Sequence, residues 1–577
     1  MAFMNFRLYA FLVALLVLGC SKQKKQASFA GGKISLCIES IDLNQQPESL
    51  TDYNTQMVLS QVFESLVSLD TKELTVKPQL AKKIDVKNDG QTYEFTLRDN
   101  VYFHDFGDSK SDRLLTPEDV VYSIEKACKK REGNIPSAAY SITYQQTLKG
   151  ADEFHEGKAE KISGVRVKGN KVILDLIRKD NNFLDKLSLV CCAVQSRKLA
   201  NSGELLIGTG PFTLMPENTD ENRIQLIKNE DYYAFDKKGN ALPYLDSLEF
   251  ILNTKKLQQL DMFEKYEVDL ILGLPTSRIT KMLEGRLDDF NSKPPIFVLH
   301  NNPQLVTNYY FFDLSEPRFQ DKRVRQAFNY AVDKSKIGQN LLQNQYYELG
   351  NYGIIPPIQS IFRGYDFDAI EKNGYAFDPI KAKALLAAAG YPNGEGFGSI
   401  NLRFNINDVH SAVADEFAKQ IKRVLNINVN IDGSTFEQLQ IDGDKGNGDI
   451  FRSAWAADYP SEESFLINFY GKLVPKNPNE LSIVNQSRYR NSLFDQYLEK
   501  AQRETKITKK REYFALAELE LIKDPPIIPL WYNGELEIVY SHVRNLNVNP
   551  LDLFIFKEVY IKEWTPKEYR DYMKKKS

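Results

Sequence analysis

Strand and helix patterns alternate along this chain, and that mixture limits the folds available to it more than any other feature. Residues 413–425 place apolar side chains at helical spacing and run directly into Ile427, Val429 and Ile431, which alternate as in a strand. Units of this kind build open sheets that are covered by helices. The 577 residues exceed the roughly 100 to 200 of one domain, so they predict an α/β protein with two large lobes and an insertion.

Turn and cap residues locate further elements. Two β-hairpins are predicted, one turning at 89–90 between strands 84–86 and 93–97, and one turning at 169–170 between strands 165–167 and 172–176. Three residues are expected to open helices: Thr116 before Pro117, Asp321, and Asp378 before Pro379. These short-range patterns predict strands and helices that are mixed along the chain.

The N-terminus has the pattern of a lipoprotein signal peptide. Arg7 precedes the uncharged run 8–18, which is too short to span a bilayer as a helix, so residues 1–20 are predicted to be cleaved. Residues 17–20 resemble the lipobox of bacterial lipoproteins, in which the cysteine is acylated, here Cys20. Residues 21–32 would then form a tether, and the protein would sit in the periplasm or cell envelope, held to a membrane by lipid.

Charge and composition exclude several classes of protein. Hydrophobic residues make up 42% and charged residues 26% of the chain, which is a globular balance rather than a disordered one. Lysine and arginine number 74 against 77 acidic residues, so no basic excess is present to grip a phosphate backbone. We therefore expect no nucleic-acid partner.

Cysteine spacing leaves the redox state open. After Cys20, four cysteines remain: Cys37, Cys128, Cys191 and Cys192. A disulfide is compatible with an exported protein, but no spacing selects a pairing, and no Cys-x-x-Cys occurs. The neighbours Cys191 and Cys192 are expected to pack as small apolar residues.

An ordered set of short segments carries a family resemblance over nearly the whole mature chain. The segments are 115–123 (LTPEDVVYS), 208–212 (GTGPF), 324–328 (VRQAF) with 331–333 (AVD), 382–390 with Tyr391, Asn393 and Gly394, 455–460 (WAADYP) and 529–532 (PLWY). In this order they resemble the family 5 extracytoplasmic solute-binding proteins of oligopeptide and dipeptide ABC importers.

That resemblance implies a two-lobed periplasmic-binding-protein-like fold with a hinge and an additional inserted domain. The expected limits are lobe I at 33–72, 198–295 and 527–577, a small inserted domain at 73–197, and lobe II at 296–526. The implied function is capture of a peptide between the lobes and delivery to the permease subunits of the importer. We expect a monomer without a cofactor.

The segment 451–460 is the main candidate for ligand binding. The resemblance implies that Asp458 pairs with the α-ammonium of the peptide, that Arg452 lies near its carboxylate end, and that Trp455 lines side-chain pockets. A zwitterionic peptide in a closed cleft needs each end charge paired, because unpaired buried charges are costly. Tyr459 and Tyr140 are further candidates, with Tyr144 beside the latter.

Several of these residues have structural alternatives. Asp458 could cap the following turn, and Trp455 could belong to the core. Residues 441–448 are rich in glycine and acid where some oligopeptide binders carry a second basic residue, and Lys445 is a poor substitute. Binding of a free carboxyl terminus is therefore left open.

Two other motifs are interpreted as structural. Residues 208–211 are expected to form a turn rather than a phosphate cradle, because Pro211 removes an amide donor and position 213 is threonine. The helix after Asp321 is amphipathic, and we expect the charge of Arg325 to lie on its solvated face with no ligand role.

The main alternative is a secreted, lipid-anchored hydrolase, which would need a nucleophile and base, a metal cluster or a carboxylate pair. The sequence contains no Gly-x-Ser-x-Gly, no His-Glu-x-x-His and no phosphate-binding loop. Its five histidines are isolated in the sequence. We predict no enzyme activity, no catalytic residue and no metal site, and keep a non-peptide solute such as a metal complex as a further alternative.

Overall fold

The computed structural model describes residues 25–50, 52–105, 109–131, 135–199, 206–215, 219–220, 222–274, 279–342 and 345–576. The predicted signal peptide and its Cys20 lie outside these ranges. None of the helices within them is long and apolar enough to cross a membrane.

One large sheet forms the frame of the described chain. Its strands are β15 (Val429–Ser434), β14 (Ile400–Asn405), β16 (Ile450–Ala456), β12 (Phe297–Phe312), β17 (Ile527–Tyr540), β11 (Leu270–Leu272), β1 (Lys33–Ile38), β10 (Ser247–Leu252), β9 (Arg223–Lys228) and β8 (Phe212–Leu214), in this spatial order. A short strand, β13 (Glu348–Leu349), also pairs with β17. Strands that follow one another in the sequence are therefore often far apart in the sheet. The chain passes between the two ends of the sheet more than once.

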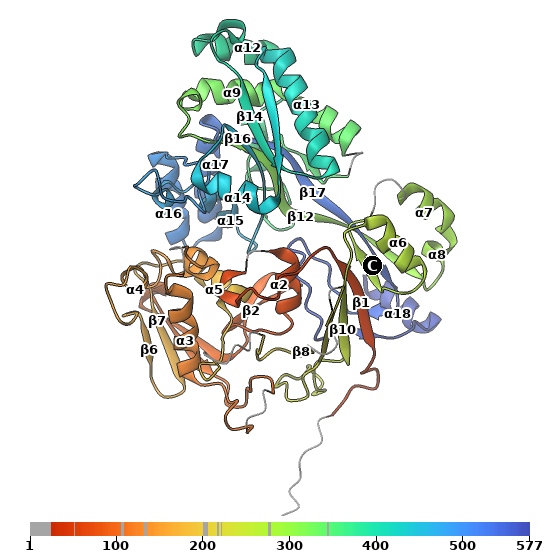
Figure 1. Cartoon of the computed structure of the whole chain (residues 1–577). Helices are drawn as coiled ribbons and strands as arrows, with labels where there is room; N and C mark the ends of the chain where they lie inside the picture. The colour runs from red at the N-terminus through yellow and green to blue at the C-terminus, as the bar shows by residue number, and fades with distance from the viewer. Residues whose placement is uncertain are drawn as a thin grey trace, which may run out of the picture.

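Two long antiparallel strands, β12 and β17, connect the upper and lower parts of the molecule (Figure 1). They pair from Phe297 opposite Tyr540 to Phe311 opposite Ile527. The register breaks between Pro303 and Thr307, where proline offers no amide for the ladder. The break interrupts the pairing at the middle of the crossing, where the two parts of the molecule meet.

The upper part, called lobe II here, has helices on both faces of its sheet (Figure 1). One face packs with α9 (Lys322–Ala331), α12 (Pro379–Ala388) and α13 (Asp408–Leu425), and the other with α15 (Glu462–Leu466), α16 (Ser492–Arg503) and α17 (Ile507–Lys523). Tyr310 and Phe312 of β12 enter the first core, while Tyr309 and Phe311 enter the second. This two-residue alternation is what a strand covered on both faces requires.

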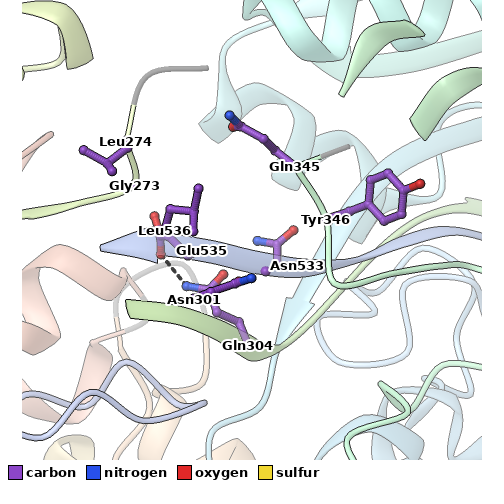
Figure 2. Close-up of a pocket in the computed structure, with 10 residues that line it drawn as sticks. Gly273, Leu274, Asn301, Gln304, Gln345, Tyr346, Asn533, Glu535 and Leu536 are labelled. Atoms are coloured by element: carbon purple, nitrogen blue, oxygen red, sulfur yellow. Dashed lines mark hydrogen bonds between the residues drawn. The ribbon is translucent and has the colours of Figure 1, made fainter. Parts of the chain in front are cut away.

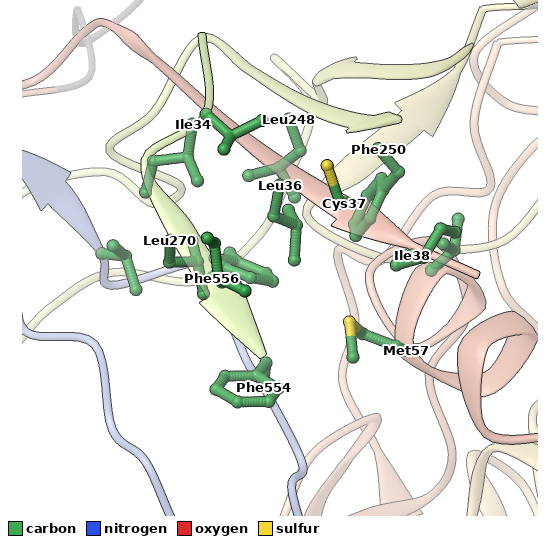
Figure 3. Close-up of a cluster of buried hydrophobic side chains, with 14 of the residues drawn as sticks. Ile34, Leu36, Cys37, Ile38, Met57, Leu248, Phe250, Leu270, Phe554 and Phe556 are labelled. Atoms are coloured by element: carbon green, nitrogen blue, oxygen red, sulfur yellow. The ribbon is translucent and has the colours of Figure 1, made fainter. Parts of the chain in front are cut away.

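The lower part contains lobe I, whose core lies beneath β1, β10 and β11 with α2 (Tyr53–Leu59) and α6 (Lys256–Glu264). Figure 3 shows Leu36 and Ile38 of β1 packed with Phe250 of β10 and with Phe554 and Phe556 from the C-terminal segment. Lobe I is therefore assembled from segments that lie more than 500 residues apart in the chain.

A small domain, coloured orange in Figure 1, lies beside lobe I and below α15 and α16. It has its own sheet and core, built from β4 (Ala81–Lys87), β5 (Thr92–Leu97), β7 (Lys171–Asp175) and β6 (Val165–Val167), with α3 (Pro117–Cys128), α4 (Ala151–His155) and α5 (Phe183–Leu187). The antiparallel pairs β4–β5 and β6–β7 confirm both predicted hairpins. The two-lobed α/β architecture with an additional domain is confirmed, whereas the exact domain limits stay a prediction.

The predicted helix starts are confirmed by their hydrogen bonds. The amide and hydroxyl of Thr116 both donate to Asp119 Oδ2, at 2.8 and 2.6 Å, and α3 begins at the next residue. Asp321 accepts from the Arg323 amide and Asp378 from the Lys381 amide, each at 2.9 Å. These local interactions satisfy amides that a helix start leaves without partners.

Two expectations need correction. Arg325 is buried instead of solvated, because its guanidinium donates to Asp524 at 2.5 Å and to the Pro525 carbonyl oxygen at 3.0 Å. Helix α13 begins at Asp408, five residues before the predicted start at 413, because Asn407 Oδ1 caps it by accepting from the His410 amide at 2.7 Å. Residues 209–211 form a bend that lies against residues 61–62, where the Gly210 amide donates to the Val62 carbonyl oxygen at 2.8 Å.

The four described cysteines, Cys37, Cys128, Cys191 and Cys192, are free and buried. Burial raises the pKa of Cys37 to about 11, so this thiol stays protonated at neutral pH. In the described chain these residues pack as small apolar side chains, as expected for Cys191 and Cys192.

Candidate functional site

Two adjoining cavities lie where the crossing strands pass between the lobes. The larger, called the cleft cavity here, has a volume of about 300 Å³, and the second, called the side cavity, has about 250 Å³. Gln304 of β12 and Asn533 and Glu535 of β17 line both. Figure 2 shows these three residues around the side cavity, together with Gln345 and Tyr346 on its far side.

The walls of the cleft cavity come from both lobes. Lobe I contributes the end of β1, the start of α2 and Lys256 of α6, and lobe II contributes Ala456 and Ala457 at the end of β16. The loop between β18 (Val543–Arg544) and β19 (Tyr560–Ile561) closes one side with Pro550, Leu551 and Asp552. A solute in this cavity would contact both lobes at once, which is the geometry that a hinge-bending binding protein needs.

Asp458 follows immediately after the two alanines of the cavity wall. Its amide donates to Ser464 Oγ at 3.0 Å, so the backbone is fixed by the start of α15. The partly buried carboxylate has no hydrogen-bond or ion-pair partner among the described residues, and burial raises its pKa to about 7. Since desolvation is the cause, a cation brought by a ligand would lower this pKa and stabilise the charged form.

Arg452 lies farther along β16, on the same face of the strand as Ala456 but four residues deeper into lobe II. At about 3.3 Å per residue this separation along the strand is about 13 Å. Its Nη2 donates to Asn308 Oδ1 at 2.8 Å and its Nη1 to Asn405 Oδ1 at 3.3 Å. Burial lowers its pKa to about 10, and no carboxylate of the described chain forms an ion pair with it.

A chain of hydrogen bonds joins Arg452 to the cavities. Asn308, which accepts from Arg452, donates through Nδ2 to Asn533 Oδ1 at 2.7 Å, and Asn533 lines both cavities. The nearby His410 ring stays neutral, because burial and the charge of Arg452 lower its pKa to about 4. Arg452 therefore reaches the cavity wall through two asparagines in this structure and lines neither cavity itself.

The three aromatic candidates are packed against protein. Trp455 points to the opposite face of β16, where it packs on the core that includes α17, and its buried Nε1 has no acceptor within the described chain. Tyr459 is 2% exposed. Tyr140 lies in the core of the small domain, where its hydroxyl donates to Asp152 Oδ1 at 2.8 Å, and Tyr144 is buried there too. The structure brings none of them into the wall of either cavity, and their binding role stays a prediction.

The segment after Asp458 docks on the small domain. Glu463 Oε1 of α15 accepts from Lys186 Nζ of α5 at 2.8 Å and from Gln502 Nε2 at 2.9 Å. Lys186 Nζ also donates to Asp180 Oδ2 at 2.9 Å, and opposite charge keeps the pKa of Lys186 above its usual value. This buried network positions the turn that carries Asp458 between lobe II and the small domain.

Sequence reasoning missed an acidic cluster beside the cleft cavity. Glu535 and Glu537 alternate on β17, and Asp552 meets them from the loop between β18 and β19, so that ligand oxygens of all three lie within 4.8 Å of one another. Glu535 and Asp552 line the cleft cavity. The Glu-Leu-Glu alternation of 535–537 was the available signal, because residues two apart in a strand share one face.

Comparisons with known proteins agree with this architecture. Residues 75–476 match the family model described as bacterial extracellular solute-binding proteins, family 5, middle. The chain is 26% identical to the dipeptide-binding protein of Escherichia coli over 552 residues, which cover 93% of this chain and 96% of that protein. It is also 26% identical to heme-binding protein A of Haemophilus influenzae over 499 residues, which cover 83% of each.

A solved structure shows the same fold. The ABC transporter-associated periplasmic binding protein DppA of Helicobacter pylori, solved in complex with the peptide STSA, matches with a TM-score of 0.77 at 20% identity. The match covers 94% of this chain and 100% of that one. At this identity the comparison supports the arrangement of lobes and does not by itself identify the solute.

Proposed function

We propose that this chain, which belongs to the bacterial extracellular solute-binding proteins of family 5, captures a peptide between its lobes and delivers it to an ABC importer. The observation that carries the proposal is Asp458, a carboxylate without a partner in the described chain, located next to a cavity whose walls come from both lobes. A carboxylate without a partner favours a ligand that carries a positively charged group.

The α-ammonium group of a peptide meets that requirement. Pairing it with Asp458 would replace the water that burial has removed from the carboxylate. Arg452, at the other end of the polar chain, has no ion-pair partner among the described residues. We assign it to the carboxylate side of the ligand, directly or through Asn308 and Asn533. The names of the dipeptide-binding relative and of the peptide-bound structure support a peptide ligand.

The location is a second part of the proposal. Residues 8–18 and Cys20 have the pattern of a lipoprotein signal, so the mature chain would begin at an acylated Cys20 and stay at the membrane surface. Residues 21–32 would tether the folded body, and the permease subunits of the importer would be its protein partner. We propose that it acts as a monomer, because one chain supplies both walls of the cavity.

The test is identification of the bound solute. The protein is purified without denaturation, the small molecules released on unfolding are identified by mass spectrometry, and the same compounds are added back in a calorimetric titration. The proposal expects peptides that are retained at about one per chain and recovered unchanged. Turnover of the peptides would support the hydrolase instead, and a co-purified porphyrin, visible by its absorbance, would favour a solute like that of the heme-binding relative.

A further inference from the structure

The acidic cluster of Glu535, Glu537 and Asp552 lies at the point where β17 passes between the lobes. Burial raises the pKa of all three carboxyl groups, that of Glu537 to about 9. Repulsion within the cluster adds to this at Glu537 and at Asp552. None of the three forms an ion pair with a lysine, arginine or histidine in the described ranges. Lys256 is close enough to Glu535 to lower its pKa, but it is paired with Glu39 and forms no ion pair with the cluster. The cluster therefore concentrates more acidic groups than the described chain neutralises.

Glu537 provides an independent sign that a cation belongs here. Its side chain is 1% exposed, and in the part of the chain that the structure describes neither carboxylate oxygen has a partner with hydrogen-bond geometry. The Asn302 side chain lies close enough to lower its pKa but does not offset the effect of burial. The neighbouring amide of Gln304 donates to Glu535 and to Asp552, and Asn302 Nδ2 lies 3.4 Å from Asp552 Oδ1. Buried polar groups are nearly always partnered, so an unpartnered carboxyl aimed into an acidic cluster indicates a missing positive group.

The cleft cavity offers the space for that group. Glu535 and Asp552 line it together with Glu39, whose carboxylate is already paired with Lys256 at 3.2 Å. Lys256 also donates to the Leu272 carbonyl oxygen at 2.9 Å. The same cavity has apolar wall from Leu272 and Leu305, against which an aliphatic stem can pack while its charged tip reaches the carboxylates.

We infer that this corner of the cleft cavity is a subsite for a cationic side chain, so that the solutes taken by this protein are peptides carrying a lysine-like or arginine-like group. The inference rests on the proposed function, because it assumes a peptide in the cleft. Two carboxylates side by side suit a guanidinium in particular, whose donors can pair with both at once.

A bare divalent cation is the competing occupant, and the geometry favours it less. The cleft cavity of about 300 Å³ is much larger than a single ion or water requires. Of the three carboxylates, only Glu535 and Asp552 line this space, whereas an ion held by the cluster would also need the enclosed Glu537. A flexible side chain with a charged tip uses both the apolar wall and the two accessible carboxylates.

The experiment uses a series of peptides that differ at one position. Ala-Lys-Ala, Ala-Arg-Ala, Ala-norleucine-Ala and Ala-Glu-Ala are titrated into the full mature chain by calorimetry after removal of bound solute. The Lys and Arg peptides are expected to bind at least about ten-fold more tightly than the norleucine peptide, and the Glu peptide most weakly. Equal binding of all four would overturn the subsite while leaving the proposed function standing, whereas no binding by any peptide would contradict the proposed function itself.

Two variants and a control test whether the preference for a cationic side chain arises at this subsite. Asp552→Asn and Glu535→Gln should each remove about ten-fold of the affinity for the Lys peptide but change that for the norleucine peptide less than about three-fold. Glu512→Gln, which alters an exposed residue of α17, should change neither. Thermal unfolding of each variant shows that it is folded.

Titration with calcium, magnesium and manganese chloride distinguishes the competing occupant. If the subsite takes a cationic side chain, Glu537→Gln should not abolish the binding of any of these divalent ions. If Glu537→Gln does abolish the binding of one of them and the peptide series shows no charge preference, the cluster is a metal site and the inference is wrong.

Discussion

Lys186 Nζ lies 2.8 Å from Glu463 Oε1, and this buried ion pair joins α5 of the small domain to α15 of lobe II. The Glu463 side chain is fully enclosed, and that of Lys186 is 6% exposed. Lys186 also pairs with Asp180, and Glu463 accepts from Gln502 and is stabilised by the nearby charge of Lys510. Removing Lys186 or Glu463 therefore leaves an uncompensated buried charge. The pair therefore couples the position of the small domain to the segment that carries Asp458.

Lys186→Met is expected to destabilise the protein strongly. The substitution leaves the Asp180 and Glu463 carboxylates without their cation in a dry interior, which costs about 3 to 5 kcal/mol in the free energy of unfolding. Lys509→Met removes an exposed pair with Glu512 on α17 and should cost at most about 1 kcal/mol. Urea unfolding of both variants checks this, and equal losses would contradict the role of the buried network.

Asp458→Asn is expected to weaken binding of a peptide with a free α-amino group by roughly 2 to 5 kcal/mol, because the ammonium loses its charged partner in a desolvated site. The matched ligand is the same peptide with an acetylated N-terminus, which should lose little further affinity in the variant. Calorimetry of the four combinations gives the coupling between residue and ligand. The same loss for both ligands would show that Asp458 only holds the turn before α15.

Binding of a neutral-side-chain peptide should strengthen as the pH rises from about 5.5 to 7.5. The free carboxyl of Asp458 has a pKa of about 7, and a bound ammonium lowers it, so binding releases a proton below pH 7. Affinity rises toward pH 7 and levels off above it, until the α-amino group of the ligand deprotonates near pH 8. The neighbours Cys191 and Tyr459 have raised pKa values and stay neutral over this range. In Asp458→Asn the part of this pH dependence that comes from Asp458 should disappear from the calorimetric affinity, while any contribution of Glu535 and Asp552, which line the same cavity and have raised pKa values, remains.

Local patterns in the sequence were enough for much of the fold. The turn at 89–90 and the cap at Thr116 depend on neighbouring residues, and both elements formed as predicted. Arg325 could not be placed in this way, because its partner Asp524 lies 199 residues away in sequence. The start of α13 was missed for a simpler reason, since the capping role of Asn407 was not recognised.

The site shows the same limit more sharply. The family resemblance drew attention to the segment containing Asp458 and Arg452. It could not show that the Asp458 carboxylate lacks a partner in the described chain, because that depends on which side chains of distant segments lie near it. The acidic cluster needs β17 and the loop carrying Asp552 to meet, and hydrophobic patterning gave no sign of that contact. The 13 Å along β16 between Arg452 and Ala456 is likewise a consequence of strand geometry that the motif alone did not reveal.

The mature protein is expected to fractionate with membranes although no described helix could span one. This prediction depends on Cys20, which lies outside the described residues, and on the lipobox-like 17–20 segment. Cys20→Ala should release the chain in soluble or unprocessed form, as followed by immunoblotting of membrane and soluble fractions. A Cys37→Ala control alters a buried cysteine of lobe I and should leave fractionation unchanged. Full membrane retention of the Cys20 variant would exclude the lipid anchor.

Ligand binding is expected to bring the two lobes closer by bending at the crossing strands. The ladder between β12 and β17 is interrupted between Pro303 and Thr307, and this interruption lies beside the cleft cavity. A ligand can shift an open–closed equilibrium only through its differential affinity for the two states, and a solute that touches Ala457 of lobe II and Lys256 of lobe I has that property. Small-angle scattering should therefore show a smaller radius of gyration at saturation.

The same measurement tests the contribution of the small domain to this motion. Because the Lys186–Glu463 pair joins it to lobe II, separating the two would expose or break a buried ion pair. Lys186→Met should therefore shift the solute-free protein toward a larger radius of gyration, and Lys509→Met should not. A scattering profile that is unchanged by saturating ligand and by Lys186→Met alike would show that the lobes do not move relative to each other, and solute would then have to reach the cavity without a hinge.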